Sequence, residues 1–359
     1  MKNGQTVAAF EKAFAEYVGA KHAIALVNGT ATLHTALVAL GVKPGDRVAV
    51  PPLTMASTTI AVLHAGAVPV FVDVDPDTWL MRQNPEIWDL PKITVSLYGL
   101  HTHYYNDAFR LVVDDAAQTL RPHIGGKDGG VREAWGHFTS YSFQSSKILP
   151  LGEGGMLVTN DEELATRARE FSSLGYRMGD GPRIDKATLK SPNYARHHSL
   201  GWNYRMNDLT AQEGLWQLPW ADEDIDKRLG CADFYEDAIQ GCSWLTPQKV
   251  PEGWTHDYWT YAVATDTPER LLWLLDAMER HGGERPYPAW RLTYHEPAFA
   301  SLVGPKYVEQ DGHKMALKRV GLCPNAESLQ PRLCQFQTND LASAERNAKA
   351  LRKCIEEAG

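Results

Sequence analysis

Apolar residues in the first half of the chain follow two different spacings. In 7–18, 33–40 and 56–64 they recur every three or four residues, which predicts helices. Between these stretches lie short, continuous apolar runs of the kind that forms buried strands. The runs are 22–27, 47–50, 68–74, 93–98, 111–114, 137–143 and 156–159. Helices alternating with such strands predict an α/β fold whose parallel or mixed sheet is covered on both faces.

The second half of the chain has a more helical pattern. The predicted helices are 209–218, 225–239, 270–281 and 341–357, and a strand is predicted at 258–263. The polar, irregular stretch 173–199 predicts a long loop, and long loops in compact domains are often functional. We place a domain boundary near 215–225, where the pattern changes. It divides the chain into a large domain, 1–218, and a small domain, 219–359.

Composition narrows the class of protein. Of 359 residues, 43% are hydrophobic and 22% charged, as in ordinary globular proteins, and this length suggests about two domains. The net charge of −8 and the absence of a basic stripe argue against nucleic acid as a partner. The most apolar stretch, 60–74, is too short and too polar to span a bilayer, and the N-terminus lacks a signal-peptide pattern. The five cysteines all follow residue 230 without a CxxC pair, which favours reduced thiols and a cytoplasmic location.

Two polar segments follow predicted strands. Asn28-Gly29-Thr30 precedes a helix, where backbone N–H groups can bind an anion and glycine lets a phosphate approach. The alternative is an ordinary turn capped by Asn28. Asp114 is the last residue of the predicted strand 111–114 and Asp115 follows it, at the sheet edge where ligands of open α/β sheets bind. A carboxylate there can keep a ring nitrogen protonated, and the alternative is a helix cap.

A third segment carries a lysine. Lys147 lies in a serine- and glycine-rich connection between two apolar strands. Partial burial would lower its pKa and make the neutral amine available as a Schiff-base nucleophile. The alternative is a solvated loop lysine. His101 and His103 have a metal-like spacing, but no carboxylate or cysteine lies at ligand intervals, so no metal site is expected.

Five motifs in one order give the chain a family resemblance, which extends from Phe10 to about Phe299. They are NGTATL at 28–33, GAVPVFVDVD at 66–75, DDAAQ at 114–118, SF followed by Lys147 and GEGG at 142–155, and GWNYR at 201–205. Together they resemble the DegT/DnrJ/StrS family of PLP-dependent sugar aminotransferases, in the fold-type-I aspartate aminotransferase superfamily. The resemblance implies a large domain with a mostly parallel seven-stranded sheet between helices, and a smaller α+β C-terminal domain.

The resemblance also implies roles for individual residues. Lys147 would hold pyridoxal 5'-phosphate (PLP) as a Schiff base and later move the proton between substrate and cofactor. Asp115 would pair with the pyridinium nitrogen, so that the ring remains an electron sink. The other cofactor contacts implied are Gln118 near the ring hydroxyl, and Gly29, Thr30 and Ser142 around the phosphate.

Further implied roles concern a second subunit and the substrate. Asn203 and Arg205 would reach the phosphate from a neighbouring subunit, which implies a homodimer with shared active sites. Met55 stands where the family usually has an aromatic residue stacked on the PLP ring. Tyr294 and His295 lie where a family histidine is common, and they are the candidate substrate-binding residues.

The reaction implied is transfer of an amino group from an amino acid, L-glutamate by expectation, to a nucleotide-linked ketosugar, with PLP cycling through pyridoxamine phosphate (PMP). A 4-keto-6-deoxy sugar is the expected acceptor, in glycan, lipopolysaccharide or secondary-metabolite biosynthesis. Alternatives are a ketocyclitol aminotransferase and an aminohydroxybenzoate-synthase-like enzyme. A PMP-dependent sugar dehydratase is disfavoured because family dehydratases replace the lysine with histidine. The intact set of Lys147, Asp115 and Gln118 disfavours a non-catalytic PLP-binding protein.

Overall fold

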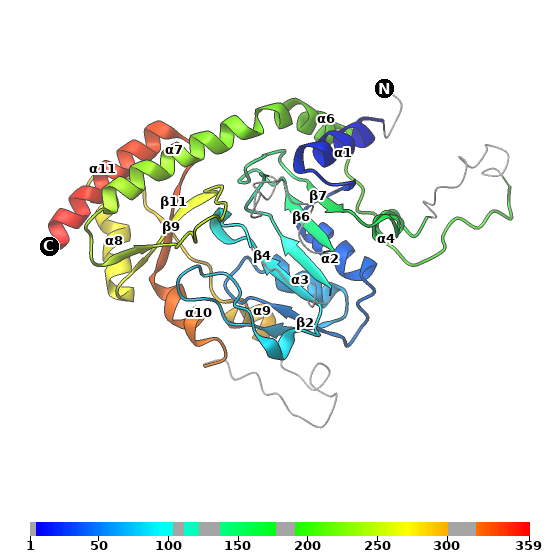
Figure 1. The fold of residues 1–359 in the computed structure, drawn as a ribbon, viewed down its shortest axis with the longest axis horizontal. Helices are drawn as coiled ribbons and strands as arrows, with labels where there is room; N and C mark the ends of the chain where they lie inside the picture. Colours follow the sequence, from blue (N-terminus) through cyan, green and yellow to red (C-terminus); the bar gives the residue numbers. More distant parts are fainter. Residues whose placement is uncertain (1–4, 103–110, 122–136, 177–190, 301–320) are drawn as a thin grey trace.

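A computed structural model describes residues 5–102, 111–121, 137–176, 191–300 and 321–359. Seven strands form its larger sheet (Figure 1). In order across the sheet they are β1 (His22–Leu26), β7 (Gly155–Thr159), β6 (Phe138–Ser142), β5 (Val112–Asp115), β4 (Lys92–Val95), β2 (Arg47–Val50) and β3 (Val68–Phe71). β7 is antiparallel to both neighbours, and the five strands from β6 to β3 are parallel. The predicted mostly parallel seven-stranded sheet is confirmed, and every strand overlaps a predicted apolar run.

The register of the central strands creates one edge for the site. Asp115, the last residue of β5, pairs with Ser140 of the parallel strand β6. The segments that follow these two strands therefore leave the sheet on the same side. One begins at Ala116 and the other contains Lys147, so two of the predicted motifs meet at the carboxyl edge of the sheet.

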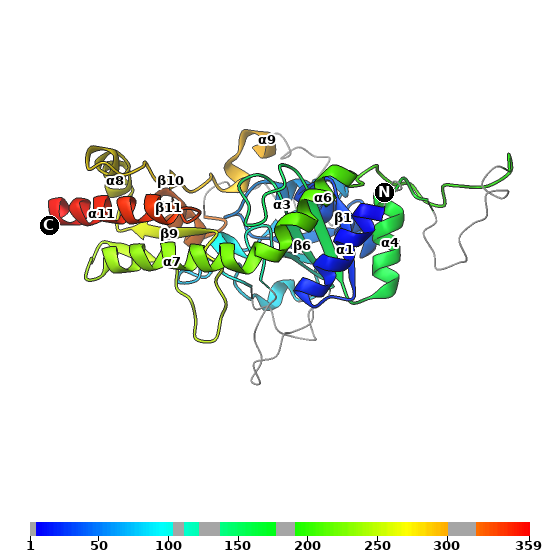
Figure 2. The same cartoon turned by 90° about the horizontal axis from the view of Figure 1, so that it is seen from above.

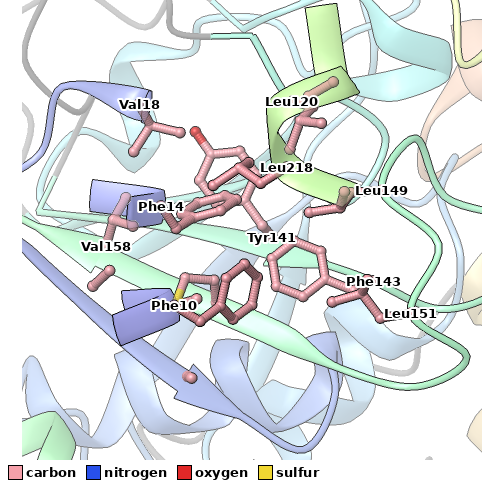
Figure 3. Close-up of a cluster of buried hydrophobic side chains, with 14 of the residues drawn as sticks. Phe10, Phe14, Val18, Leu120, Tyr141, Phe143, Leu149, Leu151, Val158 and Leu218 are labelled. Atoms are coloured by element: carbon pink, nitrogen blue, oxygen red, sulfur yellow. The ribbon is translucent and has the colours of Figure 1, made fainter. Parts of the chain in front are cut away.

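Helices cover both faces of this sheet. They are α1 (Gln5–Val18), α2 (Gly29–Ala39), α3 (Ser57–His64), α4 (Glu162–Ser172) and α6 (Asp208–Gln217). α1 and α6 share one apolar cluster with the strands, whereas α2, α3 and α4 share the cluster on the opposite face. On the α1 face, the ring of Phe14 lies 5.1 Å from that of Tyr141 and 5.4 Å from that of Phe143, both edge-on (Figure 3). Such pairs contribute roughly 0.5–1.5 kcal/mol each beyond the area they bury.

A second, antiparallel sheet follows later in the chain. Its order is β10 (Tyr287–Pro288), β11 (Leu333–Gln337), β9 (Thr260–Thr265) and β8 (Leu245–Pro247). The helices of this half are α7 (Ala221–Ile239), α8 (Pro268–Arg280), α9 (Pro297–Ala300), α10 (Pro324–Leu329) and α11 (Leu341–Ala358). α7 and α11 lie side by side (Figure 2), and together with α8 they bury one apolar cluster against the sheet. Short 3-10 helices occur at Pro85–Ile87, Leu97–Gly99, Leu218–Trp220, Thr293–His295 and Gln330–Arg332.

All seven predicted helices are present, with differences at their ends. The helices α4, α9 and α10 and three of the four strands of the second sheet were not predicted. Of the predicted loop 173–199, residues 177–190 lie outside the described residues, and the remainder contains no helix or extended strand. The division at 218/219 stays a prediction; it falls in the 3-10 helix Leu218–Trp220, between α6 and α7. Among the described residues, no helix has the length and apolar character to cross a membrane.

Candidate active site

Lys147 lies in the connection between β6 and β7 and is partly buried. Its backbone N–H donates to the carbonyl of Gln144, which closes a tight turn just before the lysine. The Nζ atom lies 4.4 Å from the centroid of the Trp259 ring. Burial lowers the pKa of Lys147 to about 8, and the carboxylate of Asp115 opposes this shift. At near-neutral pH a useful fraction of the side chain is therefore the neutral amine.

Asp115 ends β5 and is 4% exposed. Its Oδ2 accepts a hydrogen bond of 2.8 Å from Oγ1 of Thr58 in α3, and its Oδ1 accepts one of 3.3 Å from the N–H of Ala117. Burial raises the pKa of Asp115 to about 6, although these hydrogen bonds and the Lys147 ammonium lower it. Desolvation thus outweighs the partners present. A protonated ring nitrogen placed here would supply the missing positive charge.

The segment Asn28–Thr30 forms the start of α2, directly beside β6. The side chain of Asn28 caps the helix by accepting a 2.9 Å hydrogen bond from the N–H of Ala31. Asn28 is therefore a helix cap, as the alternative interpretation of this segment expected. A Cβ added to Gly29 would come within 2.9 Å of Cβ of Ser142. The glycine therefore keeps the Ser142 hydroxyl next to the first turn of α2. Free N–H groups and a hydroxyl in one place suit a phosphate group.

Gln118 and Met55 occupy different environments. Gln118 is buried, and its Oε1 accepts a 2.5 Å hydrogen bond from the backbone N–H of Tyr98, whose φ of 61° is unusual for a tyrosine. Met55 is 49% exposed, and its sulfur accepts from the N–H of Ser57 at the start of α3. The same turn leads to Thr58, so the segment that presents Met55 also holds Asp115.

A cavity of about 770 Å³ opens at Lys147. Its volume lies in the range of small-molecule sites, and its walls come from the Lys147 segment, α7 and the second sheet. Apart from Lys147, the lining residues are Ser145, Ser146, Ile148, Pro150, Asp224, Lys227, Arg228, Trp259, Thr260, Tyr287, Pro288, Trp290, Gln335, Gln337, Thr338 and Asn339. Aromatic rings beside amide and hydroxyl groups are suited to a polar ligand with a flat or ring-shaped part.

Comparison with known proteins decides the class of this site. The model of the DegT/DnrJ/EryC1/StrS aminotransferase family matches residues 1–85 and 106–329. The chain belongs to this family. It is therefore a PLP-dependent sugar aminotransferase by class.

Individual relatives support the assignment. A GDP-perosamine synthase from Caulobacter vibrioides is 34% identical over 319 residues, covering 83% of this chain and 80% of the relative. The structure of an aminotransferase from Psychrobacter cryohalolentis is similar with a TM-score of 0.80 and 26% identity, covering 99% and 92% of the two chains. A 3-amino-5-hydroxybenzoic acid synthase structure has a TM-score of 0.78 and 25% identity, covering 99% and 91%.

The described residues fit the cofactor of this family. The close approach of Gly29 to Ser142 leaves no room for a side chain at the N-terminus of α2, which is the end of a helix that suits a phosphate. Asp115 is a buried carboxyl short of positive charge, and the Lys147 amine has a lowered pKa. When bound, PLP supplies an electron sink for the substrate carbon that loses and gains the proton.

Asn203 and Arg205 are exposed in this aminotransferase chain. Their segment runs beside β1: the N–H of Val27 donates to the carbonyl of Tyr204, and Arg205 pairs with Leu26 in an isolated bridge. In the described part of the chain, no hydrogen bond joins either side chain to the Gly29–Ser142 cradle. Their predicted role at the phosphate of a partner subunit stays a prediction.

Tyr294 and His295 are not among the residues that line the Lys147 cavity. Tyr294 is buried, stacks edge-on against Phe71 and donates its hydroxyl to Oε1 of Glu327 at 2.8 Å. Burial raises the pKa of this phenol, with the Glu327 carboxylate adding to the effect. The ring of His295 stands perpendicular to that of Tyr294, with 4.6 Å between centroids. Their predicted contact with substrate stays a prediction.

Sequence reasoning missed the residues that connect these groups. Thr58 and Trp259 touch the two predicted catalytic residues, yet they lie 57 and 112 positions away from them in the chain. The predicted metal-like pair is partly outside the described residues, because His103 is not described. His101 instead pairs with the buried Asp257 at 3.0 Å. The described residues contain no cluster of three or more potential metal ligands.

Proposed function

We propose that the protein transfers an amino group from L-glutamate to a nucleotide-linked 4-keto-6-deoxy sugar. The observation that carries this proposal is the placement of Lys147 and Asp115 at one sheet edge, beside a cavity of about 770 Å³ lined by aromatic and amide side chains. The similarity to GDP-perosamine synthases supports a nucleotide-linked sugar as the acceptor.

In this proposal the described residues divide the work. Lys147 holds the cofactor covalently and, when released, carries a proton to and from the substrate carbon at its Nζ atom. Asp115 orients the cofactor ring and keeps its nitrogen protonated, while Thr58 fixes the direction of the carboxylate. Gly29 and Ser142 hold the phosphate end. Thr30, Gln118 and Met55 are the other cofactor contacts proposed from the same subunit.

The proposed active enzyme is a homodimer. Arg205 and Asn203 are exposed, and large apolar side chains nearby in the sequence are exposed as well. These are Leu200, Trp202, Leu209, Trp216 and Trp220, with exposed fractions of 96%, 56%, 85%, 67% and 54%. Exposed apolar side chains of this size favour a protein surface as their partner. A second copy of the chain would cover them and bring Arg205, whose charge is permanent, to the phosphate.

Two measurements test the proposal. Borohydride reduction of the PLP-loaded protein should attach the cofactor to the peptide containing Lys147, and Lys147→Ala should abolish this attachment. Lys227→Ala is the matched control, because Lys227 lines the same cavity and should leave the attachment intact. Label on a different lysine would refute the assignment.

The acceptor is tested by incubating nucleotide ketosugars with glutamate and identifying products by mass. An aminated 4-keto-6-deoxy sugar is the expected product. Amination of a ketocyclitol, or formation of an aminohydroxybenzoate, with no product from any nucleotide sugar would refute the proposed acceptor while leaving the transaminase class intact.

A further inference from the structure

Trp259 is the aromatic residue in contact with Lys147. The lysine Nζ lies over the indole ring, 4.4 Å from its centroid, which is well within the range of a cation–π interaction. Trp259 as a whole is 8% exposed, so the contact is largely shielded from water. Such shielding strengthens the attraction between an ammonium group and the ring face.

The indole is fixed at several points. Its Nε1–H donates a 2.6 Å hydrogen bond to the carbonyl of Ser146, the residue before Lys147. The backbone carbonyl of Trp259 accepts hydrogen bonds from the Arg228 guanidinium at 3.0 Å and from the Thr338 hydroxyl at 2.9 Å. A Cβ added to Gly99 would lie 2.7 Å from the backbone nitrogen of Trp259, so this backbone is also tightly packed. The ring therefore has a defined position relative to the lysine.

The charged groups around Lys147 bear on how the Trp259 ring can act on its ammonium. Asp115 attracts the ammonium, and Arg228 lines the cavity wall as a buried cation. Asp224 and Lys227 pair with each other at 2.8 Å on the cavity wall. A carboxylate in the place of Trp259 would hold the proton too firmly for transfer near neutral pH. A π face stabilises the ammonium more weakly, and so leaves it able to give up its proton.

We propose that the face of Trp259 is the resting place of the Lys147 ammonium whenever the lysine is not bound to cofactor, which makes Trp259 a positioning residue of the reaction. The inference rests on the proposed function only in taking Lys147 as the cofactor lysine. The contact itself can be tested in the cofactor-free protein.

The first test needs no substitution of Trp259. Protons lying over an aromatic ring resonate upfield because of the ring current. In cofactor-free protein labelled with ¹³C-lysine, the ε-CH₂ signal of Lys147 should lie upfield of the other lysine signals, and Lys147→Arg assigns it by removing it. Adding PLP should move the signal away from this position. An ε-CH₂ signal among those of ordinary lysines would overturn the proposal.

The second test compares two replacements of the ring. Trp259→Phe keeps an aromatic face, whereas Trp259→Leu keeps only an apolar surface. The pKa of Lys147, read from the pH dependence of its ¹³Cε shift, should be higher in the Phe variant than in the Leu variant by about 0.5 to 1 unit, a three- to tenfold difference in proton affinity. An equal or higher pKa in the Leu variant would overturn the cation–π contact.

Trp290→Leu is the control, because Trp290 lines the same cavity and its ring lies 6.3 Å from that of Trp259. Trp290→Leu should leave the pKa of Lys147 unchanged. If it lowers this pKa as much as Trp259→Leu does, the effect belongs to the cavity as a whole and the role of Trp259 is overturned. Failure of the proposed function is distinguishable, because borohydride label on another lysine leaves the upfield signal in place.

Discussion

Asp115 and Asp114 are adjacent carboxylates on β5, and we expect their replacement by asparagine to change stability in opposite directions. In the cofactor-free protein, Asp115 is a buried group whose pKa is raised from 3.8 to about 6 by burial. Asparagine has nearly the same shape and can still accept the hydrogen bond from Thr58. Asp115→Asn therefore removes a buried charge while keeping the packing.

The sign and size of the effect follow from the pKa shift. Because the folded protein binds this proton more tightly than the unfolded chain, stability is highest below the ordinary pKa of 3.8 and falls as pH rises to about 6. A shift of about two units corresponds to about 3 kcal/mol at neutral pH. The Asp115→Asn variant should thus be more stable than the wild type by a few kcal/mol at pH about 7.5, and by little at pH about 4.

Asp114 supplies the matched control. It accepts hydrogen bonds from Ser96 Oγ at 3.2 Å and Thr102 Oγ1 at 3.1 Å. Asp114→Asn weakens these charge-assisted bonds and should destabilise the protein by about 1–3 kcal/mol. Urea unfolding across this pH range measures both variants. If Asp115→Asn is no more stable than the wild type at neutral pH, or if its advantage does not change with pH, the argument from desolvation is wrong.

Adding PLP should reverse the order of stability, so that the wild type becomes more stable than the Asp115→Asn variant. A ligand stabilises the folded state in proportion to its affinity, and the wild-type carboxylate offers the ring nitrogen a charge that asparagine lacks. The variant should therefore gain less stability from PLP and lose most of its transaminase activity. Greater stability without cofactor, combined with weaker activity, is the expected trade-off at a functional site.

Two further predictions concern the proposed phosphate end of the site. Gly29→Ala places a Cβ within 2.9 Å of Cβ of Ser142, so it should weaken PLP binding and lower the free energy of unfolding by about 1–3 kcal/mol. Urea unfolding at increasing PLP concentrations measures both effects. Gly230→Ala is the control, because its Cβ would approach only one leucine methyl, at 3.3 Å, and it should leave PLP affinity unchanged. Mixing Lys147→Ala with Arg205→Ala should restore up to about a quarter of wild-type activity if subunits exchange randomly, because one site of each mixed dimer is intact; no recovery after proven exchange would contradict a site shared between subunits.

The larger sheet could be predicted because its signal is local. A central strand covered on both faces must be apolar at nearly every position, and each such run is visible without knowledge of its partners. α4 also had a local signal that was overlooked: Asp161 caps the helix by accepting from Leu164 N–H, and Leu164, Ala168 and Phe171 lie at helical spacing. Its omission was a failure of interpretation and not of the sequence.

The second sheet had a much weaker local signal. β10 contains two residues and β8 three, so neither is long enough to show an alternating pattern. Both depend on partners far away in the chain: Tyr287 of β10 pairs with Gln335 of β11, and Leu245 of β8 pairs with Thr265 of β9. Only the tertiary fold identifies such short segments as strands.

The candidate site also contains residues with a local sequence signal and residues that only the tertiary fold brings in. Lys147 and Asp115 could be selected as candidates because each belongs to a short motif at or just after the end of a strand, and their catalytic roles stay predictions. Thr58 could not, since a threonine on an apolar helix gains its role only when that helix lies against the end of β5. Trp259 likewise became part of the site only because the chain returns to the larger sheet more than a hundred residues after Lys147.

The contacts of Asp257 fix the position of the Trp259 segment relative to the larger sheet. Asp257 is fully buried, pairs with His101 at 3.0 Å and accepts hydrogen bonds from the N–H groups of Leu120 and Arg121. Although burial raises the pKa of this carboxyl, the His101 charge and these hydrogen bonds lower it to about 2. Leu120 lies five residues after Asp115, and Trp259 lies two residues after Asp257. One buried carboxylate, that of Asp257, therefore connects the segment that carries Trp259 to the segment that follows Asp115, so Trp259 and Asp115 share one anchor.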